Sequence, residues 1–158
     1  MLNHNDGENF KWHDLLVEAN GMFFDLLVFG IILTAYEIWT AKREKIERLH
    51  EEIDDYRGWD EKEATYRIVG AIKRLNKSGI HNLHLRQCFL KEAKLEGADL
   101  RGAVLVEAIL EEANLKNTSL QGAYLLWAVI RKANLDEANL QGANLQGANL
   151  EEASAFRT

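Results

Sequence analysis

Few residues of this 158-residue chain have the types and spacing that catalysis or metal binding requires. Its single cysteine, Cys88, has no second thiol with which to form a disulfide or a cysteine metal site. His81 and His84 stand three residues apart, but the sequence offers no third metal ligand beside them. None of the serines stands beside a residue that could act as its base, and no phosphate-binding glycine loop occurs. The sequence therefore predicts a protein that is not an enzyme and uses no metal, cofactor or small-molecule substrate.

One acidic residue draws attention because its neighbours are apolar. Asp25 lies within the segment Met22–Trp39, which reads MFFDLLVFGIILTAYEIW. An acid inside a membrane bundle often marks an ion path or the place of a cationic partner. One hypothesis is that Asp25 forms a ring at the axis of an oligomer. The other is that Asp25 lies at a membrane interface, where the helix starts.

The C-terminal half of the chain repeats with a period of five residues. Leucine occupies every fifth position from Leu85 to Leu150, with Ile130 as the one replacement. Alanine stands two positions before most of these leucines, and glycine stands two positions after several of them. A period of five matches neither a helix nor a strand, whose apolar periods are about 3.6 and 2. It predicts a coil of short straight sides in which leucine and the small residue point inward and glycine turns the corner.

The run Ala-Asn-Leu-Gln-Gly and its variants resemble the motif of the pentapeptide-repeat family: alanine, asparagine or aspartate, leucine, then two free positions. The resemblance covers about Ile80–Ala155. It implies a right-handed, four-sided parallel β-helix, with four repeats in each coil. Leu83, Cys88 and Thr118 stand where the motif has alanine, and we expect them in the core, with Cys88 as a buried, inert thiol.

Two helices are predicted before the repeats. An apolar segment that runs into a seven-residue pattern predicts a long helix from about Asp14 to Tyr56. A second helix ends at Gly79, and Asp60 would cap its start together with Glu63. Its place suggests that it plugs the open end of the coil. The predicted fold class is α+β, with three parts: a membrane-anchor and oligomerisation helix (1–57), a capping helix (58–79) and a pentapeptide-repeat β-helix (80–158).

The segment Met22–Trp39 is predicted to anchor the chain in a membrane. Basic residues follow it directly: Lys42, Arg43, Lys45 and Arg48. Acidic residues dominate before it, so the positive-inside rule places the C-terminal side in the cytoplasm. The span is short, because its longest uncharged run, Leu26–Tyr36, makes about 17 Å of helix against a bilayer core of about 30 Å. A buried helix in a soluble oligomer is therefore the alternative.

A stripe along the long helix has the spacing of a coiled-coil seam. It predicts that the helix associates with a second copy of itself. The seam consists of Asp25, Ile32, Trp39, Ile46, Leu49, Ile53 and Tyr56. The alternative is an ordinary amphipathic helix that packs on its own domain.

Apolar residues also gather on the outside of the predicted coil. With four sides in each coil, residues twenty apart stack on one side, and apolar replacements of asparagine fall on two adjacent sides only. The resulting patch consists of Phe89, Val104, Val106, Ile109, Tyr124, Leu126, Trp127 and Val129. Exposed patches of this kind usually mark interfaces, with aromatic residues as anchors. Three covers are open: the helix Glu61–Leu75 of the same chain, a symmetric copy, or another protein.

Charge narrows the range of partners. The net charge is −6 and no basic patch stands out, so we expect no nucleic acid to bind. The predicted function is a scaffold that oligomerises and is anchored by its helix in a bacterial inner membrane, with the repeats in the cytoplasm. Its partners are a second copy, membrane lipid and possible other protein subunits. The alternatives are a soluble cytoplasmic homo-oligomer, a small membrane effector or channel, and the DNA-mimicking topoisomerase inhibition known in this family. A short, nearly neutral tower disfavours the last of these.

Overall fold

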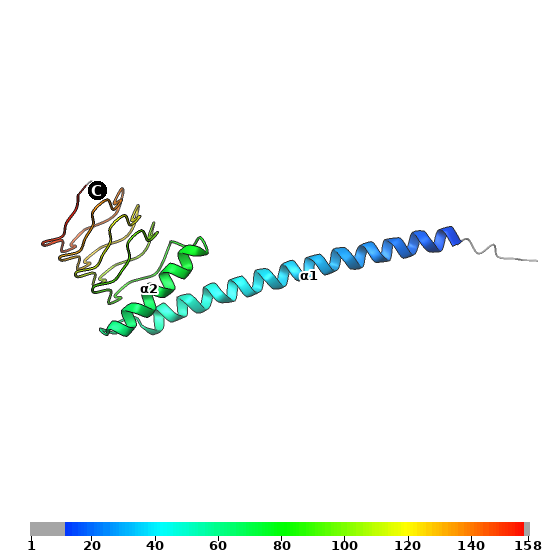
Figure 1. Cartoon of the computed structure of the whole chain (residues 1–158), viewed down its shortest axis with the longest axis horizontal. Coiled ribbons are helices and arrows are strands. Elements are labelled where there is room, and N and C mark those ends of the chain that lie inside the picture. The colour runs from blue at the N-terminus through cyan, green and yellow to red at the C-terminus, as the bar shows by residue number, and fades with distance from the viewer. Residues whose placement is uncertain (1–11, 157–158) are drawn as a thin grey trace, which may run out of the picture. The chain divides into compact units, whose positions relative to one another are not determined.

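The computed structural model of the protein describes residues 12–156, with two helices, α1 (Trp12–Asp55) and α2 (Lys62–Lys77), followed by a solenoid (Figure 1). Residues 1–11, which hold part of the acidic charge used in the topology argument, lie outside the described residues. The chain divides into two compact units, Met1–Arg43 and Glu44–Thr158. The division falls inside α1, so one helix contributes to both units.

The long helix predicted from Asp14 to Tyr56 is confirmed as α1. From Asn20 onward α1 is long and apolar enough to cross a membrane, judged by length and composition alone. Its most apolar window has no buried residue within the structure. The apolar segment of the first unit is thus a bare helical surface.

The second helix is confirmed, but the predicted capping box at its start is wrong. Its N-cap is Glu61 rather than Asp60, and no side chain caps it. Asp60 stands one residue before the N-cap, and the Glu63 carboxylate accepts a hydrogen bond from Arg67 at 2.9 Å instead of reaching back to the start of the helix. One face of the helix is buried: Ala64, Thr65, Ile68, Val69, Ala71, Ile72 and Leu75. Gly79, with a φ of +81°, lies where the chain leaves the helix.

The repeats form a solenoid in which residues twenty apart lie side by side. Eleven parallel bridges join such residues, the first between His84 and Val104 and the last between Asn134 and Ser154. From Val104 onward each bridging residue turns both of its backbone groups to the preceding coil. The amide of Val104 donates to the carbonyl of Leu83 at 2.8 Å, and the carbonyl of Val104 accepts from the amide of Leu85 at 2.8 Å. Among the described residues every such contact is a single bridge and no longer strand occurs. Sides of five residues leave too few between corners for a longer ladder.

The inside of the solenoid is built from the two inward positions of each repeat. The leucines from Leu85 to Leu135 and the alanines between them are almost completely buried. Leu83 and Cys88 are fully buried as predicted. Thr118 is also buried, and its hydroxyl donates to the carbonyl of Leu95 at 3.0 Å, so its polar group is satisfied.

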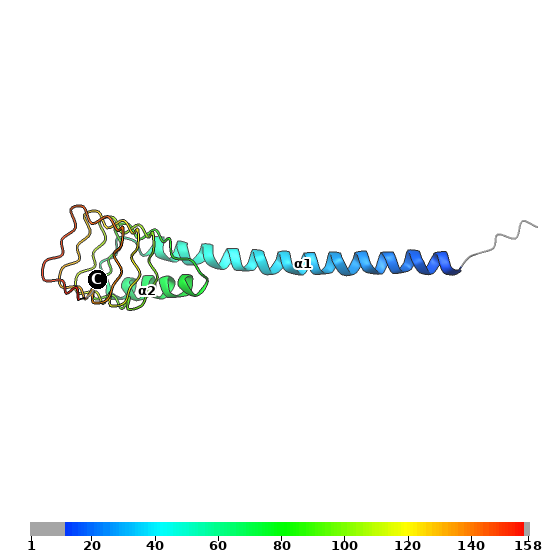
Figure 2. The same ribbon diagram turned by 90° about the horizontal axis from the view of Figure 1, so that it is seen from above.

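Helix α2 covers the first coil, as the sequence predicts (Figure 1). Ile68, Ile72 and Leu75 join one apolar core with the leucines of that coil. The last turns of α1 enter the same core through Leu49 and Ile53. Viewed from above, α2 again lies beside the first coil, with the last turns of α1 next to it (Figure 2). The two helical segments of the second unit therefore close the solenoid at its N-terminal end.

Candidate functional site

The predicted patch residues lie on two adjacent sides of the solenoid. Parallel bridges stack Val104 beneath Tyr124 on the first side, and Ile109 beneath Val129 on the second. Phe89 begins the second stack, because it bridges to Ile109. Val106, Leu126 and Trp127 belong to repeats of the first side, in the free positions that follow the central leucine. The solenoid thus brings the eight residues to neighbouring positions.

Two aromatic side chains are the most exposed members of the patch. Tyr124 is 51% exposed and Trp127 is 61% exposed, whereas the other six residues are half-buried. The half-buried aliphatic residues form a floor, and the two aromatic rings stand above it. An arrangement of this kind is typical of a protein interface, where a few aromatic anchors supply most of the binding energy.

Trp127 occupies an unusual backbone conformation for its size. Its φ is +58°, in the left-handed region that favours glycine. The residue one coil further on is Gly147, and a methyl group there would lie 2.3 Å from the Trp127 ring. The indole therefore lies against the backbone of the next coil. Eight other non-glycine residues among those described adopt the same corner conformation, so it belongs to the repeat, and the contact with Gly147 is what distinguishes Trp127.

Paired charges border the apolar residues on the second side. Lys91 lies 3.1 Å from Glu111, and Arg131 lies 3.2 Å from Glu151, each pair spanning neighbouring coils. The hydrogen bond raises the pKa of Lys91 and lowers the pKa of Glu111. Both pairs are accessible to solvent and contribute little to stability. They give the patch a polar rim of the kind that surrounds protein interfaces.

Helix α2 does not cover the exposed aromatic residues. It contacts the solenoid at the first coil, where the Thr65 hydroxyl donates to the carbonyl of Phe89 at 3.2 Å. Tyr124 lies two coils beyond the first coil, which the helix contacts, and its side chain remains exposed. The helix of the same chain therefore leaves Tyr124 and Trp127 exposed.

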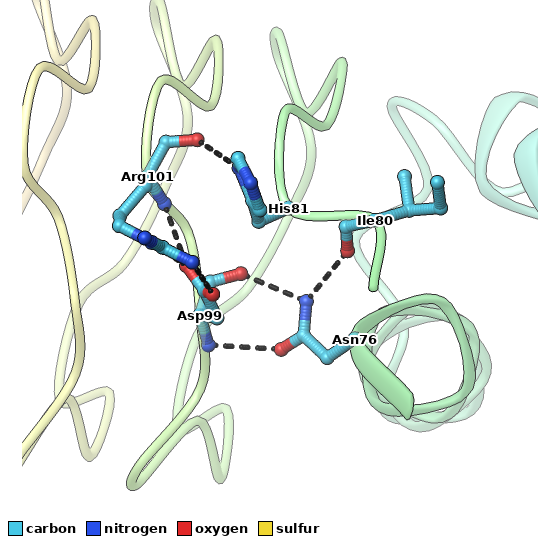
Figure 3. Close-up of polar contacts among 5 residues, drawn as sticks. All are labelled: Asn76, Ile80, His81, Asp99 and Arg101. Atoms are coloured by element: carbon cyan, nitrogen blue, oxygen red, sulfur yellow. Dashed lines mark hydrogen bonds and ion pairs between the residues drawn. The ribbon is translucent and has the colours of Figure 1, made fainter. Parts of the chain in front are cut away.

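The clearest polar contacts with the first coil come from Asn76, near the end of α2 (Figure 3). Its amide nitrogen donates to the carbonyls of Asp99 (2.8 Å) and Ile80 (3.0 Å). Its amide oxygen accepts the backbone N–H of Asp99 at 2.9 Å. The carboxamide of Asn76 thereby takes the place of a bridging residue in a preceding coil. Sequence reasoning missed this contact, because nothing in the local pattern distinguishes Asn76 from an ordinary surface asparagine.

Arg57 satisfies a further part of the same edge. Its guanidinium donates to the carbonyl of Arg86 at 2.7 Å and to the carbonyl of His84 at 3.1 Å. His84 is exposed, and the ring of His81 contacts the carbonyl of Arg101 at 3.1 Å. The described part of the chain holds no group of three or more residues that could bind a metal ion. The two histidines thus lie at the edge of the first coil, where each contributes to a hydrogen bond with a backbone carbonyl.

The predicted helix seam divides between the two units. Asp25, Ile32 and Trp39 lie in the first unit, where all three are exposed. The remaining four residues belong to the second unit. Leu49 and Ile53 are buried there, and Ile46 and Tyr56 pack against the core. The second half of the seam is therefore occupied within the chain, and only the first half is available to a second copy.

Comparison with known proteins identifies the same five-residue repeats in the C-terminal half of the chain. The sequence model of the family described as Pentapeptide repeats (8 copies) matches residues 81–111, 108–147 and 133–157. No curated protein was found to match the chain.

Three similar solved structures carry the same description. HetL from the cyanobacterium Nostoc sp. strain PCC 7120, described as involved in heterocyst differentiation regulation, is 38% identical over 48% of this chain and 37% of HetL (TM-score 0.47). Rfr23 from the cyanobacterium Cyanothece 51142 is 36% identical over 48% of each chain (TM-score 0.35). A second Nostoc PCC 7120 protein is 34% identical over 56% of this chain and 80% of its own (TM-score 0.30). This chain thus spans less than half the length of HetL and of Rfr23. With its five-residue period, its inward leucines and the family match over these repeats, the chain belongs to the pentapeptide-repeat family.

Proposed function

We propose that this protein is a membrane-anchored interaction protein without enzymatic activity. Helix α1 holds it in a bacterial inner membrane, and the repeats present the apolar patch to a protein in the cytoplasm. The observation that carries the proposal is the bare apolar surface of α1 between Met22 and Trp39. Thirteen large apolar side chains of this segment are between 37% and 70% exposed.

Such a surface is costly in water. Burying one large apolar side chain contributes about 1.5–3 kcal/mol, and soluble monomers rarely expose contiguous apolar patches of more than a few hundred Å². The segment therefore needs a cover. Either a bilayer or further protein would supply one.

The charges and aromatic residues around the segment favour a bilayer. Tyr36 and Trp39 stand at its C-terminal end, where interfacial aromatic residues are common, and a basic stretch follows. Asp25 and Glu37 lie towards opposite ends of the segment, so each is close to an interface rather than at the centre. This order orients the repeats towards the cytoplasm. The competing candidate is a soluble homo-oligomer that covers the same segment with other copies of α1.

Cell fractionation tests the anchor. We expect the full chain to pellet with membranes, to resist a carbonate wash and to be released only by detergent. Ile31→Lys places a charge near the middle of the segment and should shift much of the protein to the soluble fraction, because a central lysine costs about 2.5–3.5 kcal/mol on insertion scales. Ile31→Leu is the control and should behave as the original chain. Full solubility of the unmodified chain without detergent would support the soluble oligomer instead.

A second experiment tests the patch. Trp127→Glu should weaken assembly or partner binding by tenfold or more, since truncation of an aromatic anchor costs about 2 kcal/mol or more. Asn117→Glu is the matched control, because Asn117 is an exposed left-handed corner with a φ of +56° outside the patch. Cross-linking and light scattering of both variants in detergent give the measurement, with circular dichroism to check the fold. Equal assembly and equal partner capture by the two variants would contradict an interface at Trp127.

We also infer that the solenoid is the right-handed, four-sided parallel β-helix that the family resemblance implies. The parallel bridges between residues twenty apart support four sides in each coil. The buried leucine and alanine positions support an inside filled by two residues from each repeat. A crystal structure of the protein in detergent would check the handedness and the length of the paired segments.

A further inference from the structure

We infer that the end of the apolar segment of α1 binds the headgroups of anionic phospholipids. The site consists of Tyr36, Trp39, Lys42 and Arg43, and we call it the collar. The inference rests on the proposed membrane anchor and adds a lipid preference to it. Two features carry it: a stack of aromatic and cationic side chains, and the absence of acidic partners for the cations.

The stack runs along one face of α1. The Tyr36 and Trp39 ring centroids lie 6.2 Å apart, and the Arg43 guanidinium carbon lies 5.7 Å from the centre of the Trp39 ring. Residues three and four apart share a helix face, so the three side chains follow one another towards the basic end. A guanidinium at this distance is attracted to the indole face and keeps its hydrogen-bond donors available.

The two cations of the collar have no acidic partner among the described residues. Lys42 and Arg43 are exposed, and neither takes part in an ion pair within the described part of the chain. At 100° for each residue, Glu37 and Glu44 lie on the other side of the helix from Lys42 and Trp39. Glu47 shares the face of Arg43, four residues further on, but no ion pair between the two side chains occurs among the described residues. The two cations of the collar are therefore available to another anion.

The position of the collar selects the occupant. Before it, Ile32 and Leu33 are 61% and 47% exposed and belong to the segment that would enter the hydrocarbon. Tryptophan and tyrosine prefer the headgroup level, and basic residues next to a span are drawn to anionic lipid, with about fivefold in affinity for each residue. A phosphate carried by a lipid lies at this level, and the guanidinium and ammonium groups can each donate to it. The partner is therefore the phosphodiester of an anionic phospholipid.

Energy transfer from Trp39 to labelled lipid tests the inference. The full chain, with Trp12, Trp59 and Trp127 replaced by phenylalanine, is reconstituted into phosphatidylcholine vesicles that contain a minor fraction of phosphatidylglycerol. The same small amount of dansyl label is placed on either lipid. We expect transfer to labelled phosphatidylglycerol to exceed transfer to labelled phosphatidylcholine by about twofold or more, and the ratio to fall at high salt.

Matched variants locate the effect. Lys42→Gln with Arg43→Gln should remove most of the excess of this ratio over one, with the remainder due to Lys45 and Arg48 in the same basic stretch. Lys73→Gln with Lys77→Gln removes the same charge from exposed positions of α2 and should leave the ratio unchanged. Inorganic phosphate should lower the ratio no more than chloride does at the same ionic strength. A larger fall with phosphate would mean that the collar binds free phosphate, and the lipid assignment would be overturned.

The remaining outcomes separate the two proposals. A ratio of one in the unmodified collar, with the protein resistant to carbonate extraction, overturns the lipid preference and leaves the anchor intact. A protein that does not enter vesicles of either composition overturns the anchor, and the collar with it.

Discussion

Cys88 shows how completely the first coil excludes water. Its side chain is fully buried at a position that alanine fills in most repeats. Burial raises the pKa of the Cys88 thiol to about 11, although the nearby Arg57 charge acts in the opposite direction. The thiol therefore remains protonated and inert at neutral pH, as the sequence predicts.

The raised pKa of Cys88 makes stability depend on alkaline pH. In the unfolded chain the thiol has its ordinary pKa of about 8.5, so above that pH the unfolded state releases the proton first. We expect the free energy of unfolding to fall by about 2 kcal/mol more in the original chain than in Cys88→Ala between pH 8 and about pH 10.5. Urea unfolding of both proteins at the two pH values gives the difference. A parallel decline would contradict the burial of a neutral thiol.

The inward residues were the part of the molecule that the sequence predicted best. Leucine and alanine recur at fixed positions, and each coil forces these positions inside, so burial follows from the period alone. The sequence predicts that Trp127 lies at a corner, but it does not predict the contact with Gly147, because that contact depends on the spacing of the coils. The predicted start of α2 at Asp60 is wrong by one residue, because Asp60 is followed by a second acidic residue and the helix begins after Glu61, which has the extended backbone of an N-cap.

At the scale of elements, α2 acts on the solenoid through Asn76 as well as through apolar contact. An isolated coil edge would leave backbone groups of Asp99 without partners, and the carboxamide of Asn76 bonds both of them (Figure 3). Arg57 and Thr65 bond other carbonyls of the same edge. The cap predicted from the position of α2 is therefore polar at its rim and apolar at its centre.

Removal of the Asn76 side chain tests this polar contribution. We expect Asn76→Ala to lower the free energy of unfolding by about 2–3 kcal/mol, because it leaves part-buried backbone groups of Asp99 unsatisfied. Asn82→Ala is the matched control, since Asn82 is exposed and surface changes usually cost less than about 0.5 kcal/mol. Urea denaturation of the full chain in detergent measures both. If the two variants were equally stable, water would satisfy the edge as well as Asn76 does.

At the scale of the whole molecule, one helix serves two units with different surroundings. The part of α1 in the first unit is apolar and exposed, whereas the part in the second unit supplies Leu49 and Ile53 to the core. The sequence presented these residues as one continuous seam, because periodicity does not reveal which partner a stripe contacts. The tertiary packing of α1 against the first coil buries the second half of the seam and leaves the first half exposed.

Substitutions in the two halves should therefore have different effects. We expect Ile53→Ala to destabilise the second unit by about 2–4 kcal/mol, because Ile53 is 1% exposed and its loss leaves a cavity. Ile32→Ala, at a 61% exposed position of the same helix, should leave urea unfolding of the solenoid unchanged. Following the unfolding of both variants in detergent by circular dichroism provides the comparison. Similar losses from both variants would mean that the seam acts as one unit.

The contact between Asn76 and Asp99 also bears on how the chain finds its winding. The inward positions carry the same residue types in successive coils, so a shift by one whole coil would preserve most inward contacts. The Asn76 carboxamide fits one backbone amide, and α2 can cover only one end. Together they fix the position of the first coil, and the register of every later coil follows from it. An otherwise degenerate set of windings is thereby reduced to a single one.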